Sequence, residues 1–300
     1  MGARAACCGL LLLLAALPAA ALECSPLVVN QPADPATISH GHGLLWRING
    51  IGGATSYLFG TMHVSDPRVL DVLSHVATEF AASGQFVLEV LFDAEVAAKL
   101  RAAMFYQDGQ RLADSAGGEL ALAAARRLAD FGIPAEHALT MKPWAAFTTL
   151  SMPRGTNSVP LDLQLLARAE RAGMPIHGLE SVAEQIAVFE QLGPALQVAL
   201  LRETVCNFDL FQRELEALVA AYVARDLVTL MIASDRYAGA DQAALLDALL
   251  WQRNQRMAAR LEPLLAAGPT FIAIGALHLP GPRGVLALLE QRGYRVEAIY

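Results

Sequence analysis

The sequence contains little cysteine and little charge. Four of its 300 residues are cysteine, and charged residues make up 17% of the chain. Acidic residues outnumber basic ones by 29 to 22, and no run of lysine or arginine occurs. A chain with a formal net charge of −7 and no basic patch is a poor partner for nucleic acid or for an anionic membrane surface. We therefore expect neither as a partner.

A hydrophobic run long enough to span a membrane is also missing, although hydrophobic residues make up 55% of the chain. The uninterrupted apolar stretch covers residues 9–22, and a spanning helix needs about 20 residues. It follows Arg4 and ends in three alanines, which is the order of a secretory signal peptide. We predict a signal peptide over residues 1–21, cleavage near Ala21, and a periplasmic or secreted protein without a transmembrane anchor.

Removal of the signal peptide leaves two cysteines, Cys24 and Cys206. In an oxidising compartment such a pair favours a disulfide, and the alternative is two unpaired thiols. A disulfide would join an extended arm, residues 22–42, to a helix far along the chain.

Several catalytic motifs are absent. The sequence has no Gly-x-Ser-x-Gly nucleophile elbow, no His-Glu-x-x-His zinc helix, no phosphate-binding Walker loop and no Cys-x-x-Cys pair. A catalytic site must therefore be built from residues that are distant in sequence.

Apolar runs predict strands at both ends of the chain, and helical spacing predicts helices between them. The turn signal Asn49-Gly50 predicts a hairpin, and Asp66-Pro67 predicts a helix start. This order predicts an α/β (α+β) fold, with a mixed sheet and a large helical insertion at about 94–160, in one domain over residues 43–300. The expected strands cover 44–48, 55–60, 85–90, 174–180, 269–275 and 294–300, and the expected helices cover 66–82, 94–152 with breaks near 116–118 and 132–134, 161–173, 181–193, 194–265 and 282–293.

A short internal repeat carries two histidines. Residues 60–63, Gly-Thr-Met-His, align with residues 275–278, Gly-Ala-Leu-His, and Pro-Arg follows at the same offset in residues 67–68 and 282–283. Each copy has an apolar strand before it and a helix and a strand after it. We therefore predict a sheet built from two related strand–GxxH–helix–strand halves, with both histidines at the same edge.

The carboxyl edge of a sheet is where α/β proteins bind ligands. His63 and His278 would meet there, and Glu89 in an apolar strand would add a carboxylate to form a metal site. Gly60 and Gly275 would permit close backbone approach or a positive φ. The alternative is a repeat that only records a duplication.

With these motifs, the blocks "TSYLFGTMHV", "KPWAAF", "RNQRM" and "GALHLPGPRGVLALLEQRGY" make the sequence resemble the TraB/PrgY/GumN family, which includes the Tiki metalloproteases that act on Wnt. The resemblance covers about residues 43–300. It implies a bacterial secreted member of the GumN type with a metal-dependent, hydrolase-like site. The divalent metal implied is manganese or cobalt, and zinc is chemically suited as well.

The resemblance also implies which residues form the site. The two GxxH histidines of the family correspond to His63 and His278, its glutamate to Glu89, and a late Arg-Asn element to Arg253 and Asn254. Taken alone, the helix pattern around Arg253 and Asn254 predicts that they lie on a solvated face. The resemblance instead implies that they bind an anion or a carbonyl group.

Two further acidic residues have local explanations. Glu180 ends a predicted strand and would either line the same edge or cap the next helix. Asp162 stands at the start of a predicted helix and would act as its N-cap.

Three functions follow from these expectations. The first is a metal-dependent hydrolase of the cell envelope that acts on a peptide or another small envelope substrate, with Glu89 as metal ligand or as general base. The second is a non-catalytic periplasmic binding protein for haem, peptide or glycan. The third is a factor in envelope or polysaccharide assembly. Whether the protein is an enzyme stays open at this point.

Overall fold

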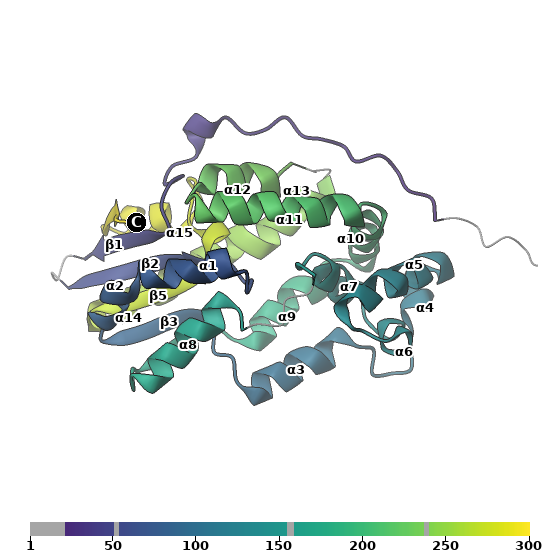
Figure 1. The fold of residues 1–300 in the computed structure, drawn as a ribbon, viewed down its shortest axis with the longest axis horizontal. Coiled ribbons are helices and arrows are strands. Elements are labelled where there is room, and N and C mark those ends of the chain that lie inside the picture. The colour runs from purple at the N-terminus through teal and green to yellow at the C-terminus, as the bar shows by residue number, and fades with distance from the viewer. Residues whose placement is uncertain (1–21, 51–53, 155–158, 237–239) are drawn as a thin grey trace, which may run out of the picture.

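A six-stranded mixed sheet forms one end of the protein, on the left in Figure 1, and helices extend from it to the right. The computed structural model describes residues 22–50, 54–154, 159–236 and 240–300, so the predicted signal peptide lies outside the described residues. The strand order is β4-β3-β5-β2-β1-β6. The strands are β1 (Leu45–Asn49), β2 (Thr55–Thr61), β3 (Gln85–Val90), β4 (Ile176–Glu180), β5 (Thr270–Gly275) and β6 (Arg295–Ala298).

Helices make up most of the rest of the described chain. The α-helices are α1 (Pro67–Asp71), α2 (Ala77–Ala81), α3 (Ala94–Met104), α4 (Leu112–Ala116), α5 (Gly118–Leu128), α6 (Ala135–Ala138), α7 (Pro143–Leu150), α8 (Leu161–Arg171), α9 (Val182–Glu190), α10 (Pro194–Cys206), α11 (Phe208–Val223), α12 (Leu227–Ser234), α13 (Ala240–Leu246), α14 (Gln252–Ala267) and α15 (Val285–Gln291). Short 3-10 turns cover Pro35–Thr37, Val72–Ser74, Ala129–Phe131 and Ala276–His278, and a π-helical turn covers Asp247–Trp251.

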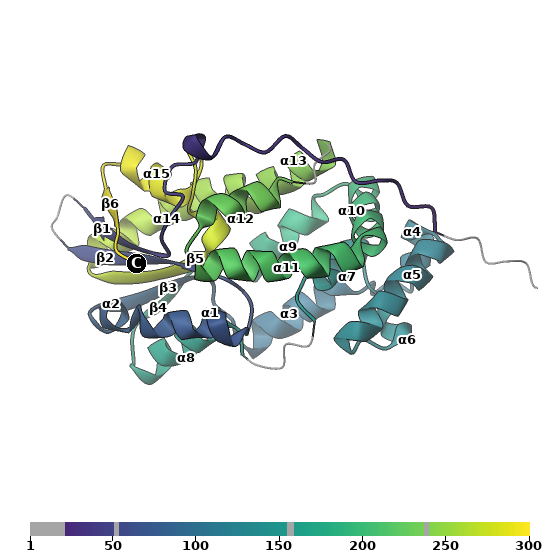
Figure 2. The ribbon, with the colours of Figure 1, turned by 45° about the horizontal axis from the view of Figure 1, so that its top comes forward.

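The elements are arranged in layers. Helices α1, α2 and α8 lie on one side of the sheet and α14 and α15 on the other (Figure 2). Strands β4, β3, β5 and β2 run parallel, while β1 is antiparallel to both of its neighbours. The predicted α/β fold with a mixed sheet is confirmed. Parallel strands must be covered on both faces, and their apolar runs supply the core.

Aromatic rings fill the core between the sheet and α2. The Phe80 ring lies 5.2 Å from that of Phe271 and 5.7 Å from that of Phe86. A second buried cluster, which includes Leu120, Trp144 and Leu201, lies among α5, α7 and α10. The protein therefore has a sheet core and a separate helical core.

The predicted hairpin and the predicted helix start are both present. β1 and β2 pair antiparallel, with Leu45 opposite Phe59, while residues 51–53 of the turn lie outside the described residues. The Asp66 side chain accepts a hydrogen bond from Arg68 N and caps α1. The single helix predicted after it is divided into α1, a 3-10 turn and α2. The five apolar residues at helical spacing in this segment are nevertheless buried. They are Val69, Val72, Leu73, Val76 and Phe80.

The two copies of the repeat lie side by side at the centre of the sheet. β2 and β5 are adjacent and parallel, with Thr61 opposite Gly275. Both GxxH turns therefore leave the sheet at the same edge, as predicted. The halves diverge afterwards, since β3 pairs parallel with β5, whereas β6 pairs antiparallel with β1 at the far end of the sheet.

Helices α3 to α7 occupy the segment predicted as a helical insertion. It contains two more interruptions than predicted, between Met104 and Leu112 and between Ala138 and Pro143. Phe105 of the first bridges to Met141 of the second. The division of the chain into an arm and a domain with an insertion stays a prediction. None of the helices in the described ranges is long and apolar enough to cross a membrane.

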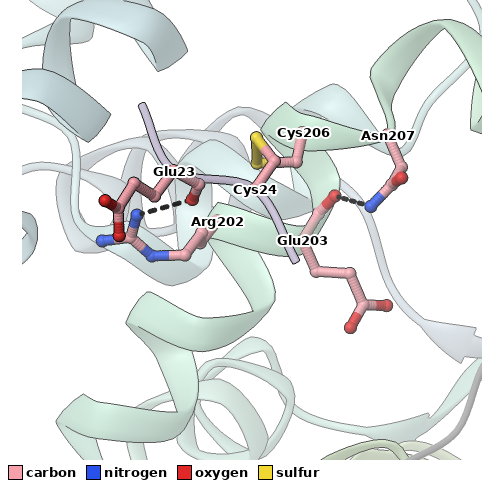
Figure 3. The surroundings of a disulfide bond; sticks show 6 residues. All are labelled: Glu23, Cys24, Arg202, Glu203, Cys206 and Asn207. Atoms are coloured by element: carbon pink, nitrogen blue, oxygen red, sulfur yellow. Dashed lines mark hydrogen bonds between the residues drawn. A yellow bond between two sulfur atoms is a disulfide. The ribbon is translucent and has the colours of Figure 1, made fainter. Parts of the chain in front are cut away.

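A disulfide joins Cys24 to Cys206 at the end of α10, as predicted (Figure 3). The segment that follows Cys24 has little regular structure and runs beside α12 (Figure 1). Two backbone hydrogen bonds hold it there, from Asn30 N to Arg236 O at 2.9 Å and from Val228 N to Gly41 O at 3.1 Å.

Loss of this disulfide will destabilise the protein. The two cysteines are 182 residues apart, and a crosslink over a long loop restricts the unfolded chain, typically by about 2–4 kcal/mol. We expect the double variant Cys24→Ser/Cys206→Ser to lose this much unfolding free energy in urea. Reductant should destabilise the native protein to the same level and leave the variant unchanged. Equal stability of the oxidised and reduced native protein would contradict this expectation.

Candidate functional site

Three side chains meet beyond the carboxyl ends of β2, β3 and β5. His63 follows β2, Glu89 lies in β3, and His278 ends the 3-10 turn that follows β5. Nε2 of His63 lies 4.0 Å from Glu89 Oε1, and Nε2 of His278 lies 3.9 Å from the same oxygen. The structure thus brings together the two repeat histidines and the glutamate. The His63 side chain is 57% exposed and that of His278 only 5%.

Each imidazole also makes a hydrogen bond through its second nitrogen, Nδ1. Nδ1 of His63 lies 2.9 Å from Asp162 Oδ2, and Nδ1 of His278 lies 2.6 Å from Asn254 Oδ1. In a neutral imidazole, an oxygen acceptor at Nδ1 places the proton there and leaves a lone pair on Nε2 that a metal would bind. Both Nε2 atoms face Glu89, and this arrangement is typical of metal-binding histidines.

The two histidines differ in their ionisation. The Asp162 carboxylate, through its charge and its hydrogen bond, raises the pKa of His63 to about 9. Burial lowers the pKa of His278 to about 4. Without a metal, His63 is therefore protonated at neutral pH and His278 is neutral.

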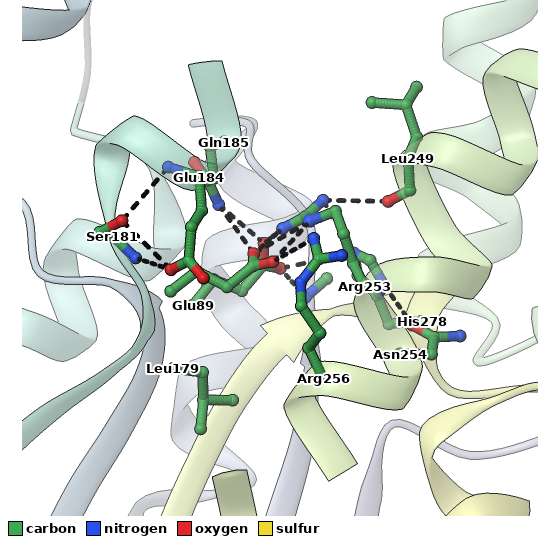
Figure 4. A network of polar contacts seen from close by, with 12 residues as sticks. Glu89, Leu179, Ser181, Glu184, Gln185, Leu249, Arg253, Asn254, Arg256 and His278 are labelled. Atoms are coloured by element: carbon green, nitrogen blue, oxygen red, sulfur yellow. Dashed lines mark hydrogen bonds and ion pairs between the residues drawn. The ribbon is translucent and has the colours of Figure 1, made fainter. Parts of the chain in front are cut away.

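A buried ion-pair network lies behind Glu89 (Figure 4). Arg253 Nη2 donates to Glu89 Oε2 at 2.6 Å and to Glu180 Oε2 at 2.7 Å, and Arg253 Nε donates to Glu180 Oε2 at 2.9 Å. Nη1 lies 3.1 Å from Leu249 O and 3.4 Å from Nε2 of His278. Four of the five N–H groups of the guanidinium bind the two glutamates and the Leu249 carbonyl, and the fifth faces Nε2 of His278. Arg253 therefore positions Glu89.

Glu89 is ionised despite its burial. Burial alone would raise the pKa of this carboxyl, but the nearby His278, His63 and Arg253 and the Gly275 N–H at 2.7 Å lower it to about 2. The site therefore contains a permanent carboxylate whose Oε1 faces both imidazoles.

The expectation of a solvated face for Arg253 and Asn254 is wrong. Both are buried, with exposed fractions of 8% and 0%. The Asn254 side chain bonds His278 on one side and donates to Arg283 O on the other. The sequence did contain a signal, because Met257 and Leu261 continue from Arg253 at four-residue spacing along the buried face of α14.

Close packing explains the glycines of the two GxxH turns, Gly60 and Gly275. Neither Gly60 nor Gly275 has a positive φ. A Cβ on Gly275 would lie 3.2 Å from Glu89 Oε1, and one on Gly60 would lie 2.8 Å from Leu279 Cδ1. Of the two reasons considered for these glycines, the structure supports close approach.

Two acidic residues do more than cap helices. Glu180 is buried and pairs with Arg253 and Arg256. Asp162 is not the N-cap of α8, a position that Pro160 occupies. Its carboxylate instead accepts from Thr61 Oγ1 and contacts His63. No local signal identifies this role, since Thr61 lies 101 residues away.

The three donors fit a divalent cation by chemistry and orientation. Two imidazole nitrogens and one carboxylate oxygen form a common metal-binding set, with bonds of about 2.0–2.2 Å. Neighbouring donors on one such ion are about 3.0–3.5 Å apart. Each Nε2 lies 3.9–4.0 Å from Glu89 Oε1, so each of these two distances needs to shorten by less than an ångström. In the described part of the chain no group of three or more His, Cys, Asp or Glu already has metal-binding spacing.

Comparison with known proteins supports a relation to metalloproteases. The model of the TraB/PrgY/gumN family matches residues 44–298. The chain belongs to this family. Two zebrafish (Danio rerio) relatives are the metalloprotease TIKI2, 27% identical over 81% of this chain, and the metalloprotease TIKI1, 28% identical over 85%. The alignments cover 58% and 63% of these longer family members. No solved structure matches.

The Asp162 carboxylate can be tested through its effect on His63. In Asp162→Asn the imidazole loses its charged partner, so the pKa of His63 should fall toward its usual value near 6.5. Metal affinity should fall about 10–100-fold, as for other groups that orient a metal ligand. Proton NMR of metal-free protein measures the pKa, and calorimetry measures the affinity.

The same contact links stability to pH. A raised pKa in the folded state stabilises the metal-free protein below the unfolded value, and this contribution disappears as the pH rises through about 9. We therefore expect native protein to lose stability relative to Asp162→Asn between pH 6.5 and pH 9. Parallel stability curves over this range would contradict the assignment.

Proposed function

We propose that this protein is a metal-dependent hydrolase that cleaves peptide bonds outside the cytoplasm. The observation that carries the proposal is that two imidazole Nε2 atoms each lie within 4.0 Å of the same ionised carboxylate oxygen. The relatives named metalloproteases support the reaction class. The site also lies beyond the carboxyl ends of parallel strands, where such sheets bind ligands.

The residues divide into ligands and groups that orient them. His63, His278 and Glu89 would hold the cation, while Asp162 and Asn254 fix the imidazoles. A bound divalent cation would supply Lewis acidity, lowering the pKa of a water molecule and polarising a carbonyl group. The exposed edge of His63 leaves room for a substrate on that side.

Glu89 acts as a ligand in this proposal. A general base works best when its pKa lies near the working pH, but the neighbours of Glu89 lower its pKa to about 2. Its Oε2 is occupied by Arg253, and its Oε1 faces both histidines. Of the two roles considered for Glu89, ligation suits this environment.

The Cys24–Cys206 disulfide supports a periplasmic or secreted location. Structural disulfides persist in oxidising compartments. A peptide or another small envelope substrate is the partner proposed for the site.

Hydrolysis can be measured on a denatured protein mixture with added Mn²⁺. Native protein should release peptides, while His63→Ala should fall to background. His137→Ala is the matched control, because His137 is exposed on α6 and lies outside the site. Identical traces for all three proteins would contradict hydrolysis. A Soret band that needs His63, without peptide release, would favour the haem-binding alternative, and binding of peptide or glycan without turnover would favour the other binding roles.

A further inference from the structure

A cavity of about 520 Å³ opens beside the candidate site. His63, Glu89 and Asp162 line one end of it. His278 is not among the lining residues, so the cavity reaches the site from the exposed side of His63. Sites for small ligands typically enclose about 300–1,000 Å³, so this space is large enough to hold part of a substrate.

Most of the remaining wall is apolar. Leu100 and Met104 come from α3, Trp144 from α7 and Ile186 and Phe189 from α9. All three helices lie outside the sheet.

Two of these lining residues, Trp144 and Phe189, are held firmly in place. The Trp144 ring stacks on Phe189 with centroids 5.2 Å apart, and its Nε1 donates to Glu190 Oε1 at 3.2 Å. Trp144 is 2% exposed. A rigid pair of aromatic side chains needs no reordering when an apolar group packs against it.

Two of the apolar side chains that line the cavity are also exposed to solvent. Phe92 and Met152 line the cavity and are 40% and 43% exposed. A group of exposed apolar side chains beside a cavity is typical of a ligand-binding groove. The described residues that line it include no lysine or arginine. The carboxylates of Glu89 and Asp162 are already paired with Arg253 and His63.

We propose that this cavity is a specificity subsite that takes a large apolar side chain of a peptide substrate, next to the bond at the metal site. The inference rests on the proposed function for its reaction and on the cavity for its specificity. Transfer of an apolar side chain from water is favourable. An acidic or basic side chain would lose hydration there without gaining a free counter-ion.

Binding to metal-free protein tests the subsite without hydrolysis. The probes are blocked pentapeptides, Ac-Ala-Ala-X-Ala-Ala-amide, with X as phenylalanine, leucine, alanine, glutamate or lysine, measured by calorimetry. We expect the phenylalanine and leucine peptides to bind at least tenfold more tightly than the other three. Equal affinities, or a preference for lysine or glutamate, would overturn the proposal.

Filling the cavity should remove this preference. Thr148 lines the cavity, and its hydroxyl bonds only to carbonyls of its own helix, so Thr148→Phe adds volume and breaks no long-range contact. The variant should lose at least tenfold affinity for the phenylalanine peptide and keep native Mn²⁺ affinity. Thr78→Phe makes the same change on the exposed side of α2 and should bind as the native protein does. If Thr148→Phe does not fold, Leu100→Phe fills the cavity from α3.

Mapping the cleaved bonds tests the proposed subsite and the proposed hydrolysis independently of each other. If the protein hydrolyses a protein mixture, the cleaved bonds should have a large apolar residue at one fixed position, and Thr148→Phe should shift that residue to a smaller one. Cleavage without such a preference would overturn the subsite and leave hydrolysis standing. Selective binding without cleavage would support the subsite and contradict the proposed reaction.

Discussion

Replacing His278 by alanine will lower the affinity for Mn²⁺ by more than 100-fold and reduce peptide hydrolysis to background. Loss of a group that only orients a ligand typically costs about 10–100-fold, and His278 is proposed as a ligand itself. Its Nε2 lies 3.9 Å from Glu89 Oε1, and its ring is almost fully buried, so water cannot easily replace it. Calorimetry with Mn²⁺ and the peptide-release assay give the two readouts.

A graded series gives this prediction a control. Asn254→Ala removes the acceptor at His278 Nδ1 but leaves the ligand in place. We expect a loss of about 10–100-fold in metal affinity for this variant, between native protein and His278→Ala. His75→Ala removes an exposed histidine that stacks on Tyr300, far from the site, and should leave both readouts unchanged. Native metal affinity in His278→Ala would rule out its role as a ligand.

Replacing Arg253 by methionine will destabilise the protein by about 3–5 kcal/mol at neutral pH. Removal of one partner from a buried ion pair leaves an uncompensated charge, and losses of this size are usual. Here Glu89 would lose the Arg253 guanidinium, while Glu180 would keep Arg256 at 3.3 Å. Urea denaturation measures the loss. It should shrink as the pH falls toward the usual range of a glutamate pKa, since a protonated Glu89 carries no charge.

The control lies one turn further along α14. Arg256→Met removes a partly exposed guanidinium with a single, longer contact to Glu180, and it should cost about 1 kcal/mol or less. Adding Glu89→Gln to Arg253→Met should recover part of the stability, because it removes the unpaired charge. A double variant as unstable as the sum of the two single variants would contradict a direct interaction between Glu89 and Arg253.

Much of the fold, and the meeting of His63, His278 and Glu89 at one edge of the sheet, could be predicted from the sequence. Apolar runs locate the strands, and the matched GxxH turns place His63 and His278 at one edge, because β2 and β5 are parallel neighbours. Local signals of this kind depend on residues close together in the chain. The cap at Asp66 and the capping box of Ser181 and Glu184 belong to the same class.

The groups that orient the site could not be predicted in this way. Asp162 contacts His63 across 99 residues, and Arg253 contacts Glu89 across 164. The pattern of α14 places Arg253 on the buried face but does not identify its partner, and Asp162 on α8 resembles an ordinary polar residue. Packing of these helices against the sheet brings both residues to the site. The split of the predicted 66–82 helix likewise depends on packing, since the same apolar positions fit one continuous helix or two short ones.

A crystal of the protein soaked in Mn²⁺ and measured at the manganese absorption edge tests the central claim most directly. The account predicts one anomalous peak at about 2.0–2.2 Å from His63 Nε2, His278 Nε2 and Glu89 Oε1, with none in His278→Ala. The distance from each Nε2 to Glu89 Oε1 should shorten by less than an ångström, since these distances are now 3.9–4.0 Å. Under saturating metal, a peak elsewhere or no peak between the two histidines would contradict it.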